Sequence, residues 1–190
     1  MEIVVDACVA RSASGTEHPV SSSCRNFLAE LTDKDSKCSL VMTSEIKEEW
    51  KRHASRFSRK LLVSLISRGK VKNLSVSNNK IRKLIENCKE INRIDPMRKD
   101  VHLIEAAIAT DNTIFSTDDR ARNHFEFLSC DSVEMQFIYW VNPVTSNAES
   151  ISWIRDEPVL KDYFKLGGMI INRDVFCESA SASEEGLDGD

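Results

Sequence analysis

Residues 2–6, Glu2-Ile3-Val4-Val5-Asp6, form a short apolar run that is rich in β-branched residues and ends in an acid. This composition predicts a buried strand. Three further runs predict strands over residues 39–43, 113–116 and 133–141. Helical patterns separate the four runs, and strands that alternate with helices are typical of a parallel sheet. The sequence therefore predicts an α/β fold of three layers, with helices on both faces of a parallel sheet.

Between the strands, apolar residues recur at intervals of three and four, which predicts amphipathic helices. We expect Gly69 to stop one of them, Pro96 to end the next, and Asp100 to open the helix after that. The polar stretch from Arg11 to Pro19 predicts a loop. The expected helices span residues 23–31, 44–67 with a break near Ser55, 78–91, 100–110 and 118–125.

The 190 residues divide by composition into three segments. Residues 1–141 carry all the predicted strands and form the expected α/β domain. Residues 142–176 hold one or two short helical patterns, around 150–155 and 159–164, and a Gly167-Gly168 turn. We expect this segment to pack against the sheet edge or a second subunit. Residues 177–190 are rich in serine, alanine and acids with little to bury, which predicts a disordered acidic tail.

Composition excludes several classes of protein. Hydrophobic residues make up 41% of the chain and charged residues 29%, so the chain is not wholly disordered. No apolar run approaches the ~18–20 residues that span a bilayer, and Met1 to Asp6 lacks the cationic start of a secretory signal. The six cysteines have no paired spacing, which favours reduced thiols in a cytoplasmic protein over a zinc site or a disulfide framework.

Charge is distributed unevenly along the chain. Residues 46–99 contain sixteen lysines and arginines against five acids, a net charge of +11, whereas the whole chain carries −4. A cationic segment of this length favours contact with a polyanion over simple solvation of helix surfaces.

Four acids occupy related places in the predicted fold. Asp6 and Asp118 each follow a strand, Asp100 opens a helix, and Glu49 lies on the helix after the second strand. The carboxyl ends of parallel strands share one rim of the sheet, so these side chains are expected to converge there. Converging carboxylates repel one another unless a cation neutralises them, and oxygen ligands favour Mg²⁺ or Mn²⁺. Alternatively, Asp100 and Asp118 only cap helices.

The segments around these acids resemble those of PIN-domain ribonucleases. The resemblance covers about residues 1–141 and depends on Ile3-Val4-Val5-Asp6, on Thr43 to Trp50, on Asp100 to Asp111 and on Ile114-Phe115-Ser116-Thr117-Asp118. It implies an endoribonuclease that depends on Mg²⁺ or Mn²⁺, with a toxin, defence or RNA-maturation role and with an antitoxin or a second copy as partner. It further implies that the catalytic and metal-binding residues are Asp6, Glu49, Asp100 and Asp118.

Several positions near these acids leave alternatives open. Glu45, Glu48 and Glu49 lie close together, and we choose Glu49, with Glu45 as the substitute one helical turn earlier. Asp119 either assists Asp118 or extends the acidic first turn of a helix, and Ser116 can hydrogen-bond a carboxylate or a phosphate. Where the family commonly has a small polar pair after its first acid, this chain has Ala7-Cys8. We interpret His102 as a surface histidine and not as a general base.

Basic residues on the helices can contact RNA phosphates, a contribution that weakens with salt. Single-stranded or looped RNA is the expected substrate because a duplex hides its bases. The Ala7-Cys8 departure supports an alternative, a catalytically weak or inactive RNA-binding or scaffold protein of this fold. A phosphatase is disfavoured because its Asp-x-Asp motif would need an acid at position 8. The candidate RNA-binding residues are Arg52, Arg56, Arg59, Lys60, Lys80, Arg82 and Lys83.

Overall fold

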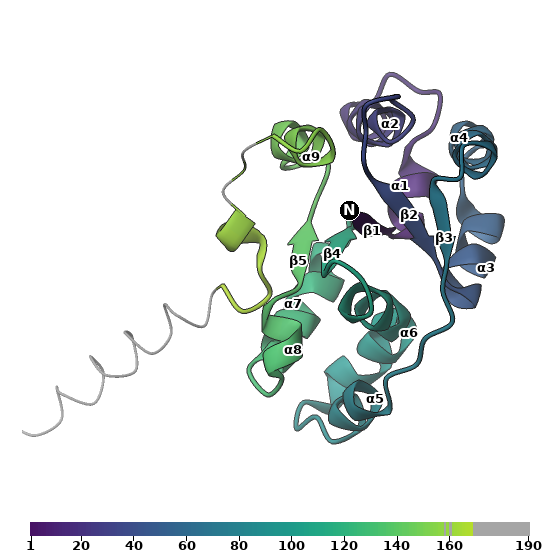
Figure 1. The fold of residues 1–190 in the computed structure, drawn as a ribbon. Coiled ribbons are helices and arrows are strands. Elements are labelled where there is room, and N and C mark those ends of the chain that lie inside the picture. The colour runs from purple at the N-terminus through teal and green to yellow at the C-terminus, as the bar shows by residue number, and fades with distance from the viewer. Residues whose placement is uncertain (158, 160, 169–190) are drawn as a thin grey trace, which may run out of the picture.

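Five parallel strands form the centre of the protein in the order β3-β2-β1-β4-β5. The computed structural model describes residues 1–157, 159 and 161–168. Figure 1 shows the strands between two groups of helices, so the α/β fold with three layers that the sequence predicts is confirmed. The strands are β1 (Glu2–Val5), β2 (Ser39–Met42), β3 (Val71–Asn73), β4 (Thr113–Phe115) and β5 (Tyr139–Val141).

The central strand β1 is apolar because it is covered on both faces. Ile3, Val4 and Val5 are fully buried, and Val4 pairs with Val41 of β2 on one side and Ile114 of β4 on the other. Strands with helices on both faces have no solvent side that a polar residue could occupy. The run that ends in Asp6 is therefore the centre of the core, and its acid emerges at the carboxyl edge.

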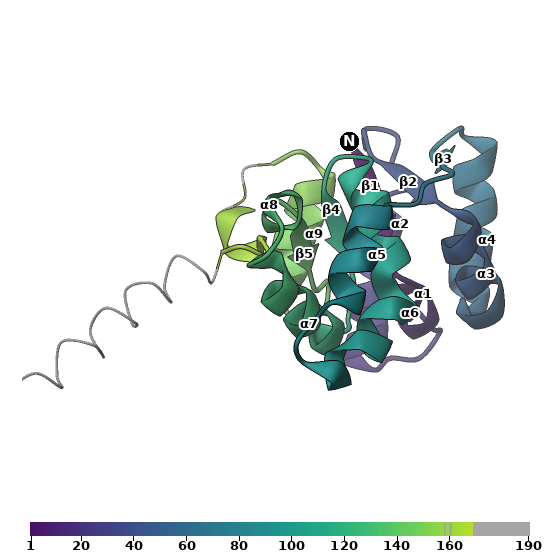
Figure 2. The ribbon, with the colours of Figure 1, turned by 90° about the horizontal axis from the view of Figure 1, so that it is seen from below.

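The helices divide between the two faces of the sheet. On one face α2 packs against α9, α1 and α4, and on the other α6 packs against α5, α7 and α8. Figure 2 shows α5 and α6 in front of the strands, with α3 and α4 at the end of the sheet where β3 lies. The helices are α1 (Ala7–Ser12), α2 (Pro19–Glu30), α3 (Ser44–His53), α4 (Arg56–Ser67), α5 (Asn79–Glu86), α6 (Ile91–Ile108), α7 (Asp119–Ser129), α8 (Val133–Gln136) and α9 (Asn147–Ile154), followed by the 3₁₀ helix η1 (Lys161–Phe164).

Local signals at several helix ends are confirmed. The predicted break near Ser55 separates α3 from α4, and the Ser55 hydroxyl caps α4. Asn78 caps α5 by accepting hydrogen bonds from the amides of Lys80 and Ile81. Gly69 follows α4 with a φ of 66°, a conformation that glycine adopts without strain.

Other boundaries differ from the prediction. The expected loop from Arg11 to Pro19 is shorter, because α1 begins directly after Asp6 and runs to Ser12 while α2 begins at Pro19. The expected strand over residues 133–141 is divided between α8 and the short strand β5. The edge strand β3 was not predicted, since only Val71 of its three residues is apolar.

The largest difference concerns α6. Pro96 does not end a helix and Asp100 does not open one: α6 is continuous from Ile91 to Ile108, with Pro96 in its second turn and Asp100 near its middle. Proline at this position removes one hydrogen bond, to the carbonyl of Asn92. Burial of the following residues, Met97 among them, offsets this loss.

The segment after β5 packs on the sheet. The Trp153 ring of α9 contacts the rings of Phe115, Tyr139 and Phe164, and Tyr139 forms an antiparallel bridge with Lys165. The predicted disordered tail, residues 177–190, lies outside the described residues. No helix in the part of the chain that the structure describes combines the length and apolar character that a bilayer crossing requires.

Candidate functional site

The carboxyl ends of β1 and β4 meet at one rim, and Asp6 and Asp118 follow these two strands. The backbone N–H of Asp6 donates to the carbonyl of Phe115 at 3.0 Å, which ties the end of β1 to the end of β4. The rim therefore joins positions more than one hundred residues apart in the sequence, as the predicted topology requires.

Asp6 is held by three donors. Its Oδ1 accepts from the backbone N–H of Cys8 at 3.0 Å, and its Oδ2 accepts from the Cys8 thiol at 2.9 Å and the Ser116 hydroxyl at 2.6 Å. Because α1 begins at once, Asp6 also caps that helix. Ser116 is fully buried and hydrogen-bonds a carboxylate, one of the two roles considered from the sequence.

Asp118 caps α7 with one carboxylate oxygen and leaves the other without a partner among the residues that the structure describes. Its Oδ1 accepts from the N–H groups of Arg120 and Ala121 at 3.0 and 2.9 Å, and its own N–H donates to Ser116 Oγ at 3.0 Å. Ser116 thereby links Asp6 to Asp118 through one hydroxyl. The cap uses only Oδ1, so Oδ2 has no hydrogen-bond partner among the described residues and can face a cation.

Asp100 is half-buried on α6, which packs against β1 and β4. It has no hydrogen-bond or ion-pair partner in the described part of the chain. Burial, followed by the negative charges of Asp6, Asp118 and Glu49, raises its pKa from 3.8 to about 6, although His102 opposes the shift. The interpretation of Asp100 as a helix cap is wrong, because the residue lies inside α6.

Glu49 faces this group from α3. Its Oε2 lies 3.3 Å from Nε2 of His102, a charge contact that is not aligned as a hydrogen bond. Burial lowers the pKa of His102, but Glu49 and Asp100 outweigh burial and raise the pKa above its usual value. The expectation that His102 is a surface residue is wrong: it is 5% exposed and contacts Glu49.

The other acids considered from the sequence are less central. Glu48 is exposed and pairs with Lys51, and Glu45 is exposed and accepts from the Ser44 hydroxyl at 2.9 Å. His102 contributes to lowering the pKa of Glu45, after the backbone and the hydroxyls of Ser44 and Thr43, so Glu45 remains near the site. Asp119 accepts from the Asn142 side-chain amide at 3.1 and 3.2 Å.

The donor set fits a hard divalent cation. The four candidates offer carboxylate oxygens, and within the described residues no lysine or arginine pairs with any of them. In the same residues no three His, Cys, Asp or Glu side chains stand close enough to ligate one ion directly. Mg²⁺ commonly keeps several waters and takes only one or two carboxylates, so the arrangement is compatible with such an ion.

Two residues at the rim, Cys8 and Thr117, were not chosen from the sequence as site residues. Cys8 accepts at Sγ from the N–H and the hydroxyl of Thr117, at 3.2 and 3.1 Å, while it donates to Asp6. Burial, together with Asp6, raises the pKa of Cys8 to about 12, so the thiol keeps its proton. The thiol thus supplies Asp6 with a hydrogen-bond donor from the first turn of α1.

The candidate RNA-binding cations differ in whether an acid of the protein already pairs with them. Arg82 forms two hydrogen bonds, of 2.7 and 2.6 Å, to the 2% exposed Glu105. Lys80 lies 3.3 Å from Glu134. The remaining cations are exposed on α3, α4 and α5 and form no ion pair among the described residues: Arg52, Arg56, Arg59, Lys60 and Lys83.

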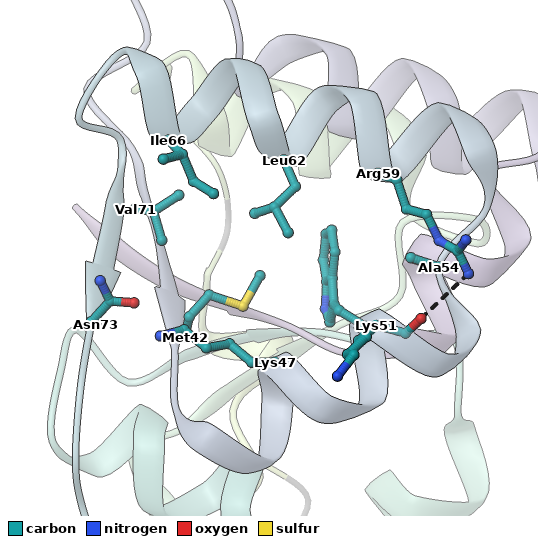
Figure 3. A pocket seen from close by; sticks show the side chains of 10 residues that line it. Met42, Lys47, Lys51, Ala54, Arg59, Leu62, Ile66, Val71 and Asn73 are labelled. Atoms are coloured by element: carbon teal, nitrogen blue, oxygen red, sulfur yellow. Dashed lines mark hydrogen bonds between the residues drawn. The ribbon is translucent and has the colours of Figure 1, made fainter.

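An apolar pocket of about 720 Å³ lies between α3, α4 and β3 (Figure 3). Met42, Leu62 and Val71 line it, and Arg59 donates to the backbone carbonyl of Lys51 at its mouth, 3.3 Å away. Trp50, the neighbour of Glu49, forms part of its wall. None of the four candidate acids lines this pocket.

No family model, no curated protein and no solved structure matches the chain.

Proposed function

We propose that the protein is a divalent-metal-dependent endoribonuclease. The observation that carries the proposal is the juxtaposition of acids at one rim: Asp6 and Asp118 follow strands whose ends are joined by the Asp6–Phe115 hydrogen bond. Burial, together with the charges of Asp6, Asp118 and Glu49, raises the pKa of Asp100. Clustered carboxylates repel one another, and a bound cation relieves that repulsion, so such a site is suited to a metal ion. The resemblance of residues 1–141 to PIN-domain ribonucleases gives the same four acids the same role.

Each acid has a distinct part in this proposal. Asp100 and Asp118 hold the ion with oxygens that lack internal partners, and Asp6 is fixed in orientation by Cys8 and Ser116. Glu49, next to His102, orients the attacking water and accepts its proton. Bound Mg²⁺ or Mn²⁺ would supply positive charge for the phosphodiester and lower the pKa of a water molecule.

The exposed cations of α3, α4 and α5 extend the proposal to the substrate. They lie on the helices that follow β2 and β3, the first of which carries Glu49, and can neutralise phosphates of a single RNA strand. We place the protein in the cytoplasm, where cysteines stay reduced, since Cys8, Cys24, Cys38, Cys88 and Cys130 are all free thiols. A toxin or defence role with an antitoxin, and a homodimer, remain expectations from the resemblance.

Incubation of the purified protein with labelled single-stranded RNA and 1–5 mM Mn²⁺ or Mg²⁺ tests the proposal. We expect internal cleavage that EDTA abolishes and that falls at least about 100-fold in Asp6→Asn, Asp100→Asn, Asp118→Asn and Glu49→Gln. Glu48→Gln and Asp131→Asn, exposed acids outside the site, serve as matched controls and should cleave normally. Cleavage that persists in the four site variants would reject the assignment.

One observation favours a second candidate, an RNA-binding or scaffold protein without turnover. Both oxygens of Asp6 already accept internal hydrogen bonds, and Glu49 already faces His102. If these contacts keep the cation out, the protein binds RNA equally well with and without Mn²⁺ and does not cleave it. Thermal unfolding with and without Mn²⁺ separates the two candidates without an activity assay, because a bound ion raises the melting temperature.

A further inference from the structure

A polar pocket of about 480 Å³ lies between the start of α6 and one face of α7, and none of its residues was chosen from the sequence. Asp118 caps α7, and the pocket residues of that helix lie in its first two turns, with His124 about 9 Å along the axis from Asp118. The pocket therefore lies beside the carboxylates, on the α7 side of the rim and not on the α3 side. It is lined by Glu90, Asn92, Arg93, Arg120, Asn123 and His124.

The wall of this pocket is fixed before any ligand arrives. Arg93 Nε donates to Glu90 at 2.5 Å, its Nη1 lies 3.4 Å from the Asn123 carbonyl and 3.2 Å from His124 Nδ1, and its guanidinium lies 4.6 Å from the centre of the Phe127 ring. An arginine always donates, so Nδ1 of His124 accepts and the imidazole proton is on Nε2. His124 thus offers one N–H donor.

Arg120 brings a free positive charge to the same pocket. Its side chain is exposed and forms no ion pair with any described residue. The amides of Asn92 and Asn123 each offer a donor and an acceptor. A free guanidinium beside amides and an imidazole combines the groups that bind a phosphate with those that bind the edge of an unpaired base.

We propose that this pocket binds one nucleotide of a single RNA strand, next to the phosphate that lies at the carboxylates. Its phosphate contacts Arg120, and its base edge faces the two asparagine amides and His124. This inference rests on the proposed endoribonuclease function and gives that function a substrate position. It assigns sequence preference to α6 and α7, whereas the cations of α3 and α4 contribute affinity without preference.

Fluorescence anisotropy with a fluorescein-labelled, ten-nucleotide single-stranded RNA in EDTA tests the pocket without cleavage. We expect Arg120→Ala to weaken binding 5- to 10-fold at low salt and to reduce the slope of log affinity against log salt by about 0.7. The control is Lys37→Ala, which removes one exposed charge, 3.7 Å from Asp156, just before β2 at the amino end of the strands and away from the carboxylates. It should change affinity less than twofold. Asn123→Ala and His124→Ala should alter the preference among oligo-A, oligo-C and oligo-U.

The outcomes separate the pocket from the proposed activity. Unchanged binding and salt slope in Arg120→Ala, a matching loss in Lys37→Ala, or no RNA binding by the wild type would each overturn the pocket. Cleavage of the same RNA with Mn²⁺ is measured in parallel. Cleavage by the wild type together with unchanged RNA binding by Arg120→Ala rejects the pocket and leaves the activity standing. Binding that depends on Arg120 without any cleavage rejects the activity and leaves the nucleotide pocket standing.

Discussion

The indole Nε1 of Trp50 donates to the backbone carbonyl of Val5 at 2.9 Å. Trp50 directly follows Glu49 and Val5 directly precedes Asp6, so one buried hydrogen bond between their neighbours sets the separation of the two acids. Two acids from different elements need such a link, because misplacement of a catalytic group by about 1 Å can reduce a rate 100-fold.

Trp50→Phe should therefore reduce both stability and cleavage. The variant leaves the Val5 carbonyl without its donor, and we expect the free energy of unfolding to fall by about 1–3 kcal/mol. Trp140→Phe is the matched control, since the buried Nε1 of Trp140 has no partner within the described residues. Urea unfolding measures the stability of the two variants, and an RNA cleavage assay measures their activity. An equal loss of cleavage in Trp140→Phe would show that the Trp50 contact has no special role.

Asp100→Asn should stabilise the protein near pH 7.5 while it abolishes cleavage. The folded-state pKa of Asp100 is raised to about 6, so the ionised carboxylate destabilises the fold and stability is lost as pH rises from about 4 to about 6. After allowance for its partial exposure, we expect a gain of about 1–2 kcal/mol at pH 7.5 that vanishes below pH 4.

The pH dependence of urea unfolding checks this expectation, with Asp131→Asn as the exposed control. Addition of Mn²⁺ should narrow the gap between the wild type and Asp100→Asn at pH 7.5, because the ion neutralises the repulsion that the variant removes. A variant that is less stable than the wild type at that pH would contradict the argument.

Cys8 should resist alkylation in the folded protein. With a pKa of about 12, only about one thiol in ten thousand is ionised at pH 8, whereas Cys130 is exposed. Iodoacetamide treatment followed by mass spectrometry should find Cys130 modified well before Cys8. Cys8→Ser keeps a donor for Asp6, but Cys8→Ala loses it and should be less stable than Cys8→Ser by about 1 kcal/mol. Rapid modification of Cys8 would show that the thiol is not held as described.

Arg82 should prove structural despite its place in the basic segment. Arg82→Met leaves the buried Glu105 carboxylate without its charge partner and with only the Asn78 N–H as a donor, for which we expect a loss of about 3–5 kcal/mol. Lys83→Ala, next to it and exposed, should change stability by less than about 0.5 kcal/mol. Chemical unfolding measures both, and the double variant Arg82→Met/Glu105→Gln should recover part of the loss. Weak RNA binding by Arg82→Met alone would therefore not identify a phosphate contact.

The sequence predicted the central strands because burial on both faces leaves a continuous apolar signal, as in Ile3-Val4-Val5. The edge strand β3 carries no such signal, since two of its three residues, Lys72 and Asn73, are exposed. The continuity of α6 was missed because Pro96 is a local signal for an ending, whereas the burial of Met97 and Val101 that overrides it depends on tertiary packing.

The rim was predicted in outline and not in detail. Asp6 and Asp118 follow from topology alone, because each comes after a strand of a parallel sheet and before the next helix. The hydrogen bonds of Cys8 to Thr117 and the contact of His102 with Glu49 join residues far apart in sequence, and no local pattern encodes them. A thiol two residues after a strand-ending acid is the one signal that could have directed attention to Cys8.

The bridge between Tyr139 and Lys165 places the η1 segment over the outer side of β5. Among the described residues, β3 is then the strand whose outer backbone groups lie open to another chain. It is short and carries Lys72, which contacts both oxygens of Glu2 at 2.7 Å, and a short, charged edge opposes pairing between molecules. Because η1 covers β5 and the other edge strand, β3, is short and charged, the sheet is poorly suited to growth by strand addition. Concentrated solutions should therefore resist fibril formation.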